Sequence, residues 1–151
     1  MIVLGIIISG FSNIGKSFLT QNKNVNCIDM DTRYFNKIDD WVNIYIECIL
    51  ALKEKYDYVL ITTYGDVLQK LNKKNIKYYL VYPQKELKEE YRNRAIKRGS
   101  DIDFIDGFFS RWNEHINDCI KNKNENKIIL NKNEYLSDII KNIEEKENEQ
   151  Y

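Results

Sequence analysis

The sequence predicts a three-layer α/β/α fold, in which helices cover both faces of a five-stranded parallel sheet. Short apolar runs of strand length alternate with longer segments in which apolar residues recur every three or four positions. This alternation is typical of parallel sheets. The first apolar run leads straight into a glycine-rich loop at residues 10–17. With 151 residues the chain fits one domain of common size, which we expect to span residues 1–143.

Three strands and two helices are expected in the first half of the chain. Ile2–Ser9 is an apolar run of strand length, and a helix should open in the glycine-rich loop that follows it. Val25–Asp29 is the second predicted strand, and Tyr58–Thr63 is the third. Asp39 or Asp40 can cap the helix between them, because apolar residues then recur on one helical face. These residues are Trp41, Tyr45, Cys48, Leu52 and Tyr56.

Two more strands are expected in the second half, again between helices. Asp66–Lys74 predicts a short helix, and Lys77–Tyr82 predicts the fourth strand, which Pro83 should end. Gln84–Arg98 is a charged helical segment that Gly99 and Ser100 should break. The remaining elements are one amphipathic helix marked by Ile105, Phe109, Trp112, Ile116 and Cys119, a fifth strand at Lys127–Leu130, and a closing helix with apolar residues Leu136, Ile139, Ile140 and Ile143. We expect the charged residues 144–151 to fray.

Composition excludes several classes of protein. Lys plus Arg and Asp plus Glu both number 23, so no net charge attracts a long nucleic acid or an anionic membrane. The cysteines Cys27, Cys48 and Cys119 are odd in number and far apart, which argues against a disulfide framework or a zinc site. The apolar run at Ile2–Ile8 is too short to span a bilayer. We therefore expect a cytoplasmic protein without a membrane partner, and the oligomeric state stays open.

The glycine-rich loop carries the pattern Gly-x-x-x-x-Gly-Lys-Ser between a buried strand and a helix, which is the Walker A pattern in its usual context. Gly10 and Gly15 let consecutive amide hydrogens point inward at phosphate oxygens. Lys16 should reach the β and γ phosphates, and the Ser17 hydroxyl should bind Mg²⁺ directly. The structural alternative is a tight turn that carries Lys and Ser by chance. The residues expected to contact the nucleotide are Gly10, Ser12, Asn13, Ile14, Gly15, Lys16, Ser17 and Phe18.

A pair of carboxylates, Asp29 and Asp31, follows the second predicted strand. One can orient Mg²⁺ through its water shell, for which we favour Asp29, and the other can hold or deprotonate an acceptor hydroxyl or contact a sugar. Ordinary loop and cap chemistry is the alternative. The third predicted strand ends in Thr62 and Thr63 without an acidic residue, which weakens a motor or GTPase interpretation. Asp66 lies nearby, where capping of a helix is its expected role.

Arginines gather in a segment at about residues 91–106, which we call the lid segment. Arg94 and Arg98 are four residues apart and therefore share one helix face. Phosphoryl transfer needs positive charge over the moving group, and a mobile arginine segment can supply it when the site closes. Arg111 could join the cluster. The alternative is a solvated face of ion pairs. His115 has no neighbour in sequence that suggests catalysis, and we expect it at the surface or at the edge of the core.

These motifs resemble the nucleoside and nucleotide kinase branch of P-loop proteins, in particular small adenylate-kinase-like proteins of bacteria and phages. They are also similar to the pattern of shikimate and gluconate kinases. The resemblance rests on residues 10–17, on Asp29-Met30-Asp31, and on Arg92, Arg94 and Arg98 with Gly99. It implies a P-loop NTPase fold with strand order 2-3-1-4-5 and an arginine lid. It further implies that Arg33 is a candidate for binding an acceptor phosphate. The acceptor segment at Tyr34–Trp41 departs from the acceptor patterns of these families.

The function expected from these features is ATP-dependent transfer of a γ-phosphate to a small molecule, with Mg²⁺ as the accompanying ion. Lys16, Asp29, Asp31, Arg94 and Arg98 are the expected catalytic residues, and Asp31, Arg33 and Arg111 are the expected acceptor ligands. A nucleoside monophosphate is the favoured acceptor. A small hydroxylated metabolite is an alternative acceptor, and a regulatory nucleotide-binding protein without transfer activity is an alternative class. Balanced charge disfavours a polynucleotide end as the acceptor. ATP and GTP are not distinguished by any motif.

Overall fold

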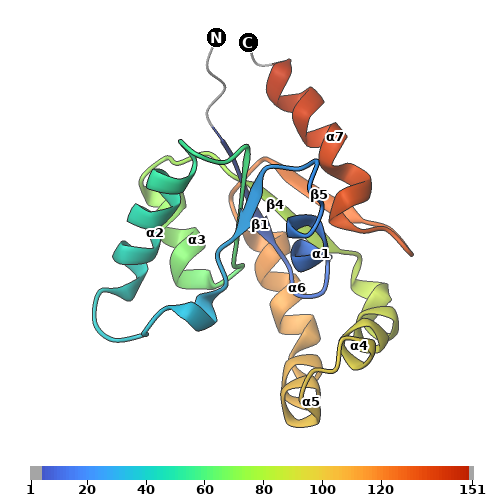
Figure 1. The fold of residues 1–151 in the computed structure, drawn as a ribbon. Helices are drawn as coiled ribbons and strands as arrows, with labels where there is room; N and C mark the ends of the chain where they lie inside the picture. Colours follow the sequence, from blue (N-terminus) through green and yellow to red (C-terminus); the bar gives the residue numbers. More distant parts are fainter. Residues whose placement is uncertain (1–4, 150–151) are drawn as a thin grey trace.

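The computed structural model describes residues 5–149 and contains a single parallel sheet (Figure 1). Within these residues the sheet has five strands in the order β2-β3-β1-β4-β5. The strands are β1 (Ile6–Gly10), β2 (Cys27–Asp29), β3 (Tyr58–Ile61), β4 (Tyr79–Pro83) and β5 (Lys127–Leu130). The predicted fold class and strand order are therefore confirmed.

The three central strands are apolar because helices cover both of their faces. Every residue of β1, β3 and β4 is buried, as expected for strands inside a parallel sheet. Ile7 pairs with Val59, and Ser9 pairs with Leu80 on the other side. This register brings the ends of β1, β3 and β4 to one edge of the sheet, where the glycine-rich loop begins.

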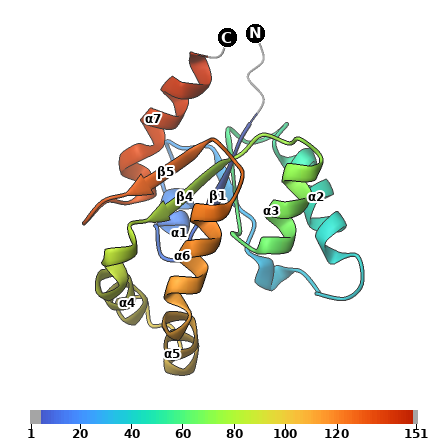
Figure 2. The ribbon, with the colours of Figure 1, turned by 180° about the vertical axis from the view of Figure 1, so that it is seen from behind.

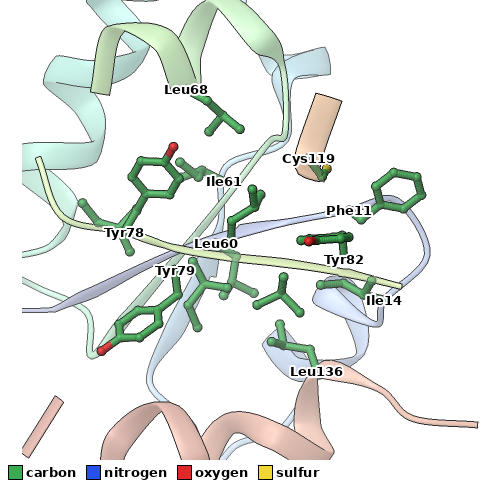
Figure 3. Packing of buried hydrophobic residues seen from close by; sticks show 14 of the residues in the cluster. Phe11, Ile14, Leu60, Ile61, Leu68, Tyr78, Tyr79, Tyr82, Cys119 and Leu136 are labelled. Atoms are coloured by element: carbon green, nitrogen blue, oxygen red, sulfur yellow. The ribbon is translucent and has the colours of Figure 1, made fainter. Parts of the chain in front are cut away.

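Helices lie on both faces of the sheet. Leu68 and Cys119 lie on one side of the central strands, and Ile14 and Leu136 lie on the other (Figure 3). The first side carries α3 (Gly65–Lys73), which contacts α2 (Trp41–Leu52), and α6 (Trp112–Lys121). The second side carries α1 (Lys16–Thr20) and α7 (Leu136–Asn148), which contact each other. The buried side chains of both sides form one continuous core.

Two helices project past the carboxyl edge of the sheet. They are α4 (Lys88–Lys97) and α5 (Ile102–Ser110), and they lie at the end of the molecule away from the C-terminal part of α7 (Figures 1 and 2). Short 3₁₀ turns at Thr32–Tyr34 (η1) and Lys85–Leu87 (η2) follow β2 and β4. The lid segment is therefore two helices joined by a turn that contains Gly99, whose φ is 82°.

Several predicted boundaries differ from the structure. The helix expected through residues 105–119 is two helices, α5 and α6, because the chain turns at Arg111. Both helices bury residues against the same core, so the apolar spacing continues across this turn. The sequence pattern therefore could not reveal the break. The charged segment expected to be helical from Gln84 begins instead with η2, and α4 ends at Lys97. Residues 2–4 of the first predicted strand lie outside the described residues.

Two predicted caps and the predicted frayed tail also differ. Asp40 occupies the N-cap position of α2, as predicted for Asp39 or Asp40, but its backbone is left-handed (φ 68°) and its carboxylate makes no capping bond. Asp66 lies inside the first turn of α3, whose N-cap position is Tyr64. The helix α7 continues through the charged residues to Asn148, and the Tyr79 hydroxyl donates to Glu147 at 2.7 Å. Residues 150 and 151 lie outside the described residues.

No helix in residues 5–149 combines the length and the apolar character that crossing a membrane requires. The cysteines at positions 27, 48 and 119 are free thiols in this structure.

Candidate functional site

The glycine-rich loop leaves β1 and turns back into α1 through two left-handed residues, Asn13 (φ 68°) and Gly15 (φ 97°). A Cβ at Gly10 would lie 2.6 Å from Ile14 Cδ1 and 3.0 Å from Lys16 Cδ, so a larger residue there would push these two side chains aside. The Phe11 amide donates to the Val81 carbonyl at 2.9 Å and anchors the loop to β4. Because α1 has only five residues, any anion binding here depends more on loop amides and on Lys16 than on a helix dipole.

Lys16 is half-buried and lies inside this loop. Its Nζ donates to the carbonyl of Gly10. Burial lowers the pKa of Lys16, and the charge of Arg98 lowers it further, while Asp29 and Asp31 oppose this change. The Lys16 ammonium therefore interacts electrostatically with Asp29, Asp31 and Arg98. A polyanion in the loop would relieve the cost of this half-buried positive charge.

The two carboxylates after β2 have opposite environments. Asp31 caps η1: its Oδ1 accepts from the Arg33 amide at 2.9 Å, and its Oδ2 accepts from Arg33 Nε at 2.8 Å. These bonds lower the pKa of the Asp31 carboxyl. Within residues 5–149 no donor bonds to the Asp29 carboxylate, and burial raises its pKa, against an opposing effect of Lys16. The Asp31 carboxylate is thus bound to Arg33, whereas the carboxylate oxygens of Asp29 are available to a ligand.

Tyr45 holds the strand ends behind the acidic pair. Its hydroxyl donates to the Met30 carbonyl at 2.6 Å and accepts from the Thr62 amide at 3.1 Å. The side chain is fully buried, and burial raises the pKa of its hydroxyl. The sequence placed Tyr45 on an apolar helix face, and nothing in the spacing indicated that its hydroxyl would join β2 to β3.

The arginines predicted to act together have different surroundings. The Arg94 side chain is only 9% exposed, and its Nη1 donates to the Asn13 carbonyl at 3.0 Å. Its Nη2 donates to the Glu134 carbonyl and to Glu90. Arg98 is exposed, its side chain makes no hydrogen bond within the described residues, and its charge acts on Lys16 and Asp29. In this structure Arg94 is bound to protein groups and the Arg98 side chain is not, and the role of both as lid arginines stays a prediction.

The remaining predicted residues lie at the rim. Arg33 is bound to Asp31 with its side chain 74% exposed, and Arg111 pairs with Glu114 at 3.1 Å in an exposed position. His115 stacks on the ring of Phe108 with ring centres 4.8 Å apart, and its partial burial lowers its pKa. This position at the edge of the core agrees with the expectation for His115.

Two aromatic residues of the site were not predicted. Phe11, inside the glycine-rich loop, is buried between the rings of Phe108 and Trp112. Tyr135 lies so close to the loop that a side chain at Gly15 would be 3.2 Å from its Cδ1. Tyr135 is about 120 positions away in sequence and is brought there by the course of β5 and α7, so no local pattern could indicate it.

The glycine-rich loop, the acidic pair, the arginines and Tyr135 line one open cleft with a volume of about 2060 Å³. The cleft includes the carboxyl edge of the sheet and continues along α3 and α6 to Asn72 and Asn122. Its whole volume therefore exceeds the ~300–1,000 Å³ usual for one small ligand. Seven of the eight residues predicted to contact a nucleotide line the cleft, and only Ile14 is excluded, because its side chain is buried in the core. The predicted acidic residues and arginines line the same cleft: Asp29, Asp31, Arg33, Arg94, Arg98 and Arg111.

The donor set suits a metal ion that arrives with phosphates. No group of three or more His, Cys, Asp or Glu side chains in the described residues could hold a metal by itself. The exposed Ser17 hydroxyl and the unbonded Asp29 carboxylate line the same cleft. Mg²⁺ is commonly held by one or two protein oxygens, with water and substrate phosphates supplying the rest. These residues therefore fit Mg²⁺ bound together with a nucleotide.

The strand order β2-β3-β1-β4-β5, with a Walker A loop after the central strand, matches the α/β fold of P-loop kinases. Among solved structures the chain is similar to a shikimate kinase from Bacteroides thetaiotaomicron, with 15% sequence identity over 85% of each chain and a TM-score of 0.48. No protein-family model matches the chain, and no curated protein matches it in sequence.

Proposed function

We propose that this protein is an ATP-dependent phosphotransferase that moves the γ-phosphate to a small molecule in a reducing cytoplasm. The observation that carries the proposal is the convergence of Lys16, Asp29 and Arg98 on one cleft at the mouth of the Walker A loop. Nucleotide binding alone needs only the loop and Lys16. Transfer of a phosphoryl group also needs an acidic residue and a further cation, the roles we give to Asp29 and Arg98.

On the donor side, the loop amides and Lys16 bind the triphosphate. Lys16 exchanges its bond to the Gly10 carbonyl for phosphate oxygens, which suits an ammonium that burial has destabilised. Mg²⁺ bound with ATP neutralises charge on the β and γ phosphates, and Ser17 and Asp29 would hold it directly or through water. Arg98, with its free donors, stabilises the charge on the moving phosphoryl group.

On the acceptor side, Asp31 and Arg33 face the same cleft from the end of β2. An acceptor oxygen attacks the γ-phosphorus in line, a new O–P bond forms, and the bond to the β–γ bridging oxygen breaks, so that ADP leaves with the electron pair. Within the small-molecule class we favour a nucleoside monophosphate, because Arg33 and Arg111 offer cations for its phosphate. Asp31 then positions the acceptor through Arg33, which it holds by hydrogen bonds, and an acceptor hydroxyl, where there is one, would pass its proton to a carboxylate.

A second candidate is a regulatory nucleotide-binding protein without transfer activity. The end of β3 favours it, because Thr62 and Thr63 stand where many P-loop ATPases carry an acidic residue. This candidate requires ATP binding and predicts that no acceptor increases ATP consumption.

A coupled assay of ATP consumption, run over nucleoside monophosphates and small hydroxylated metabolites, tests the proposal. We expect one acceptor to raise ATP consumption well above the rate with water alone. Arg98→Ala should then lower turnover by roughly tenfold to a thousandfold with little change in ATP affinity. Binding of ATP with no active acceptor would support the regulatory candidate instead, and equal turnover in Arg98→Ala would remove this arginine from the mechanism.

A further inference from the structure

Arg94 is an enclosed cation at the cleft, and its surroundings differ from those of an arginine whose donors are free to bind a substrate. Its guanidinium lies between two aromatic rings, 4.3 Å from the centre of Tyr91 and 3.8 Å from the centre of Tyr135. Stacking on both faces leaves only the edge of the guanidinium for hydrogen bonds. With the side chain 9% exposed, its charge must be satisfied by protein groups.

The edge of the guanidinium joins three segments that are distant in sequence. Nη1 donates at 3.0 Å to the carbonyl of Asn13. Asn13 belongs to the glycine-rich loop at residues 10–17, which we call the phosphate loop from here on. Nη2 donates at 3.0 Å to the carbonyl of Glu134, in the loop of residues 131–135 between β5 and α7, and at 2.9 Å to Glu90 on α4. Glu90 in turn accepts from the Asn133 amide at 3.1 Å. Arg94 and Glu90 thus bind both loops to α4.

The bond to Asn13 acts on a left-handed residue of the phosphate loop. Asn13 has φ 68°, a conformation that is unfavourable for residues with a side chain, although Asn adopts it more readily than most. Its carbonyl direction fixes the peptide plane that leads into Ile14 and Gly15, whose amides should face the phosphates. Holding that plane before a ligand arrives reduces the ordering that binding must supply.

We propose that Arg94 is a positioning residue for the phosphate loop: by binding the Asn13 and Glu134 carbonyls between two tyrosine rings, it holds the loop in its phosphate-binding form. Arg94 therefore acts through the loop backbone, while Arg98, one helical turn later and exposed, supplies charge to the reaction. This inference rests on the proposed function where it concerns nucleotide, but the backbone bonds themselves do not depend on it.

Arg94→Lys is the central variant, since it keeps the positive charge and loses the flat group that spans two carbonyls and two rings. Glu90→Gln is the second variant. It keeps Arg94 but weakens the hydrogen bonds that Glu90 accepts from Arg94 and from the Asn133 amide. The control is Ile143→Val in α7, a substitution in the buried core away from the cleft that lowers stability without touching either loop. Binding of Mg·ATP and of tripolyphosphate is measured by calorimetry well below each variant's Tm.

We expect Arg94→Lys to weaken the binding of both probes by a similar factor, about tenfold or more, because tripolyphosphate has no base and meets only the phosphate loop. Glu90→Gln should weaken both to a smaller extent, and Ile143→Val should leave both unchanged. In hydrogen exchange without ligand, the amides of residues 13–16 should exchange faster in Arg94→Lys than in the wild type or in Ile143→Val.

Three results would overturn the inference. If Arg94→Lys loses ATP binding but binds tripolyphosphate normally, Arg94 is a contact for the base or the ribose. Normal binding of both probes with reduced turnover would return Arg94 to the lid role. Unchanged exchange at residues 13–16 would show that the loop does not depend on this tie. If the wild type binds neither probe, the proposed function fails, and the exchange measurement still decides whether Arg94 holds the loop.

Discussion

At the scale of single residues, the acidic pair shows how two identical side chains acquire different properties. Asp31 accepts three hydrogen bonds from Arg33, and these lower the pKa of its carboxyl. Asp29 has no such partner in the part of the chain that the structure describes, and burial raises the pKa of its carboxyl. The charge of Asp29 therefore costs stability in the ligand-free protein, which is a common property of residues kept for function.

Asp29→Asn should raise the Tm at about pH 7. The folded pKa of Asp29 lies above its unfolded value, so ionisation favours the unfolded state, and a neutral amide removes that penalty. The gain should shrink as the pH falls from about 7 to about 3, below the ordinary Asp pKa of about 3.9, because the unfolded carboxyl is then mostly protonated and the folded one, with its raised pKa, more so. Thermal unfolding at both pH values measures the difference.

Asp31→Asn is the matched control and should have the opposite sign. Its folded pKa is lowered, so the ionised form stabilises the fold at neutral pH, and its loss should lower the Tm there. A lower Tm for Asp29→Asn at neutral pH would contradict this account of the pair.

At the scale of elements, the phosphate loop and the lid helices share a core. Phe11 lies two per cent exposed between the rings of Tyr91 on α4, Phe108 on α5 and Trp112 on α6, with ring centres 5.3 to 6.4 Å away. The Trp112 Nε1 also donates to the Lys85 carbonyl at 2.9 Å. The helices that project beyond the sheet are therefore packed against the loop that should bind phosphate.

Phe11→Ala should destabilise the protein by about 3–5 kcal/mol, because a large cavity opens among rings that cannot collapse together. It should also weaken binding of Mg·ATP, since the loop loses its anchor to α5 and α6. Urea unfolding measures the first effect and calorimetry the second. Phe104→Ala on α5, whose side chain is 54% exposed, is the control and should change stability by less than about 0.5 kcal/mol. Equal effects of the two variants would contradict the packing argument.

At the scale of the whole molecule, the sequence predicted the sheet and the contents of the cleft better than the contacts inside it. Alternating apolar runs determine the five strands, and the carboxyl ends of parallel strands must meet at one edge, so the loop, Asp29 and Arg98 could be placed together. The break at Arg111 was missed because one core keeps the helical spacing across it. The enclosure of Arg94 was missed because Tyr135 and the 131–135 loop arrive only through tertiary folding.

The central claim is that residues 10–17 bind the triphosphate of ATP through Lys16, and calorimetric titration of the wild type and Lys16→Ala with Mg·ATP tests it most directly. Lys16 makes no contact that the core requires beyond its bond to the Gly10 carbonyl, so Lys16→Ala should keep its fold by circular dichroism. We expect the wild type to bind Mg·ATP and Lys16→Ala to bind it about a hundredfold more weakly, because charged hydrogen bonds to phosphate are lost. Equal affinity of the two proteins for Mg·ATP, with the fold intact in both, would contradict the account.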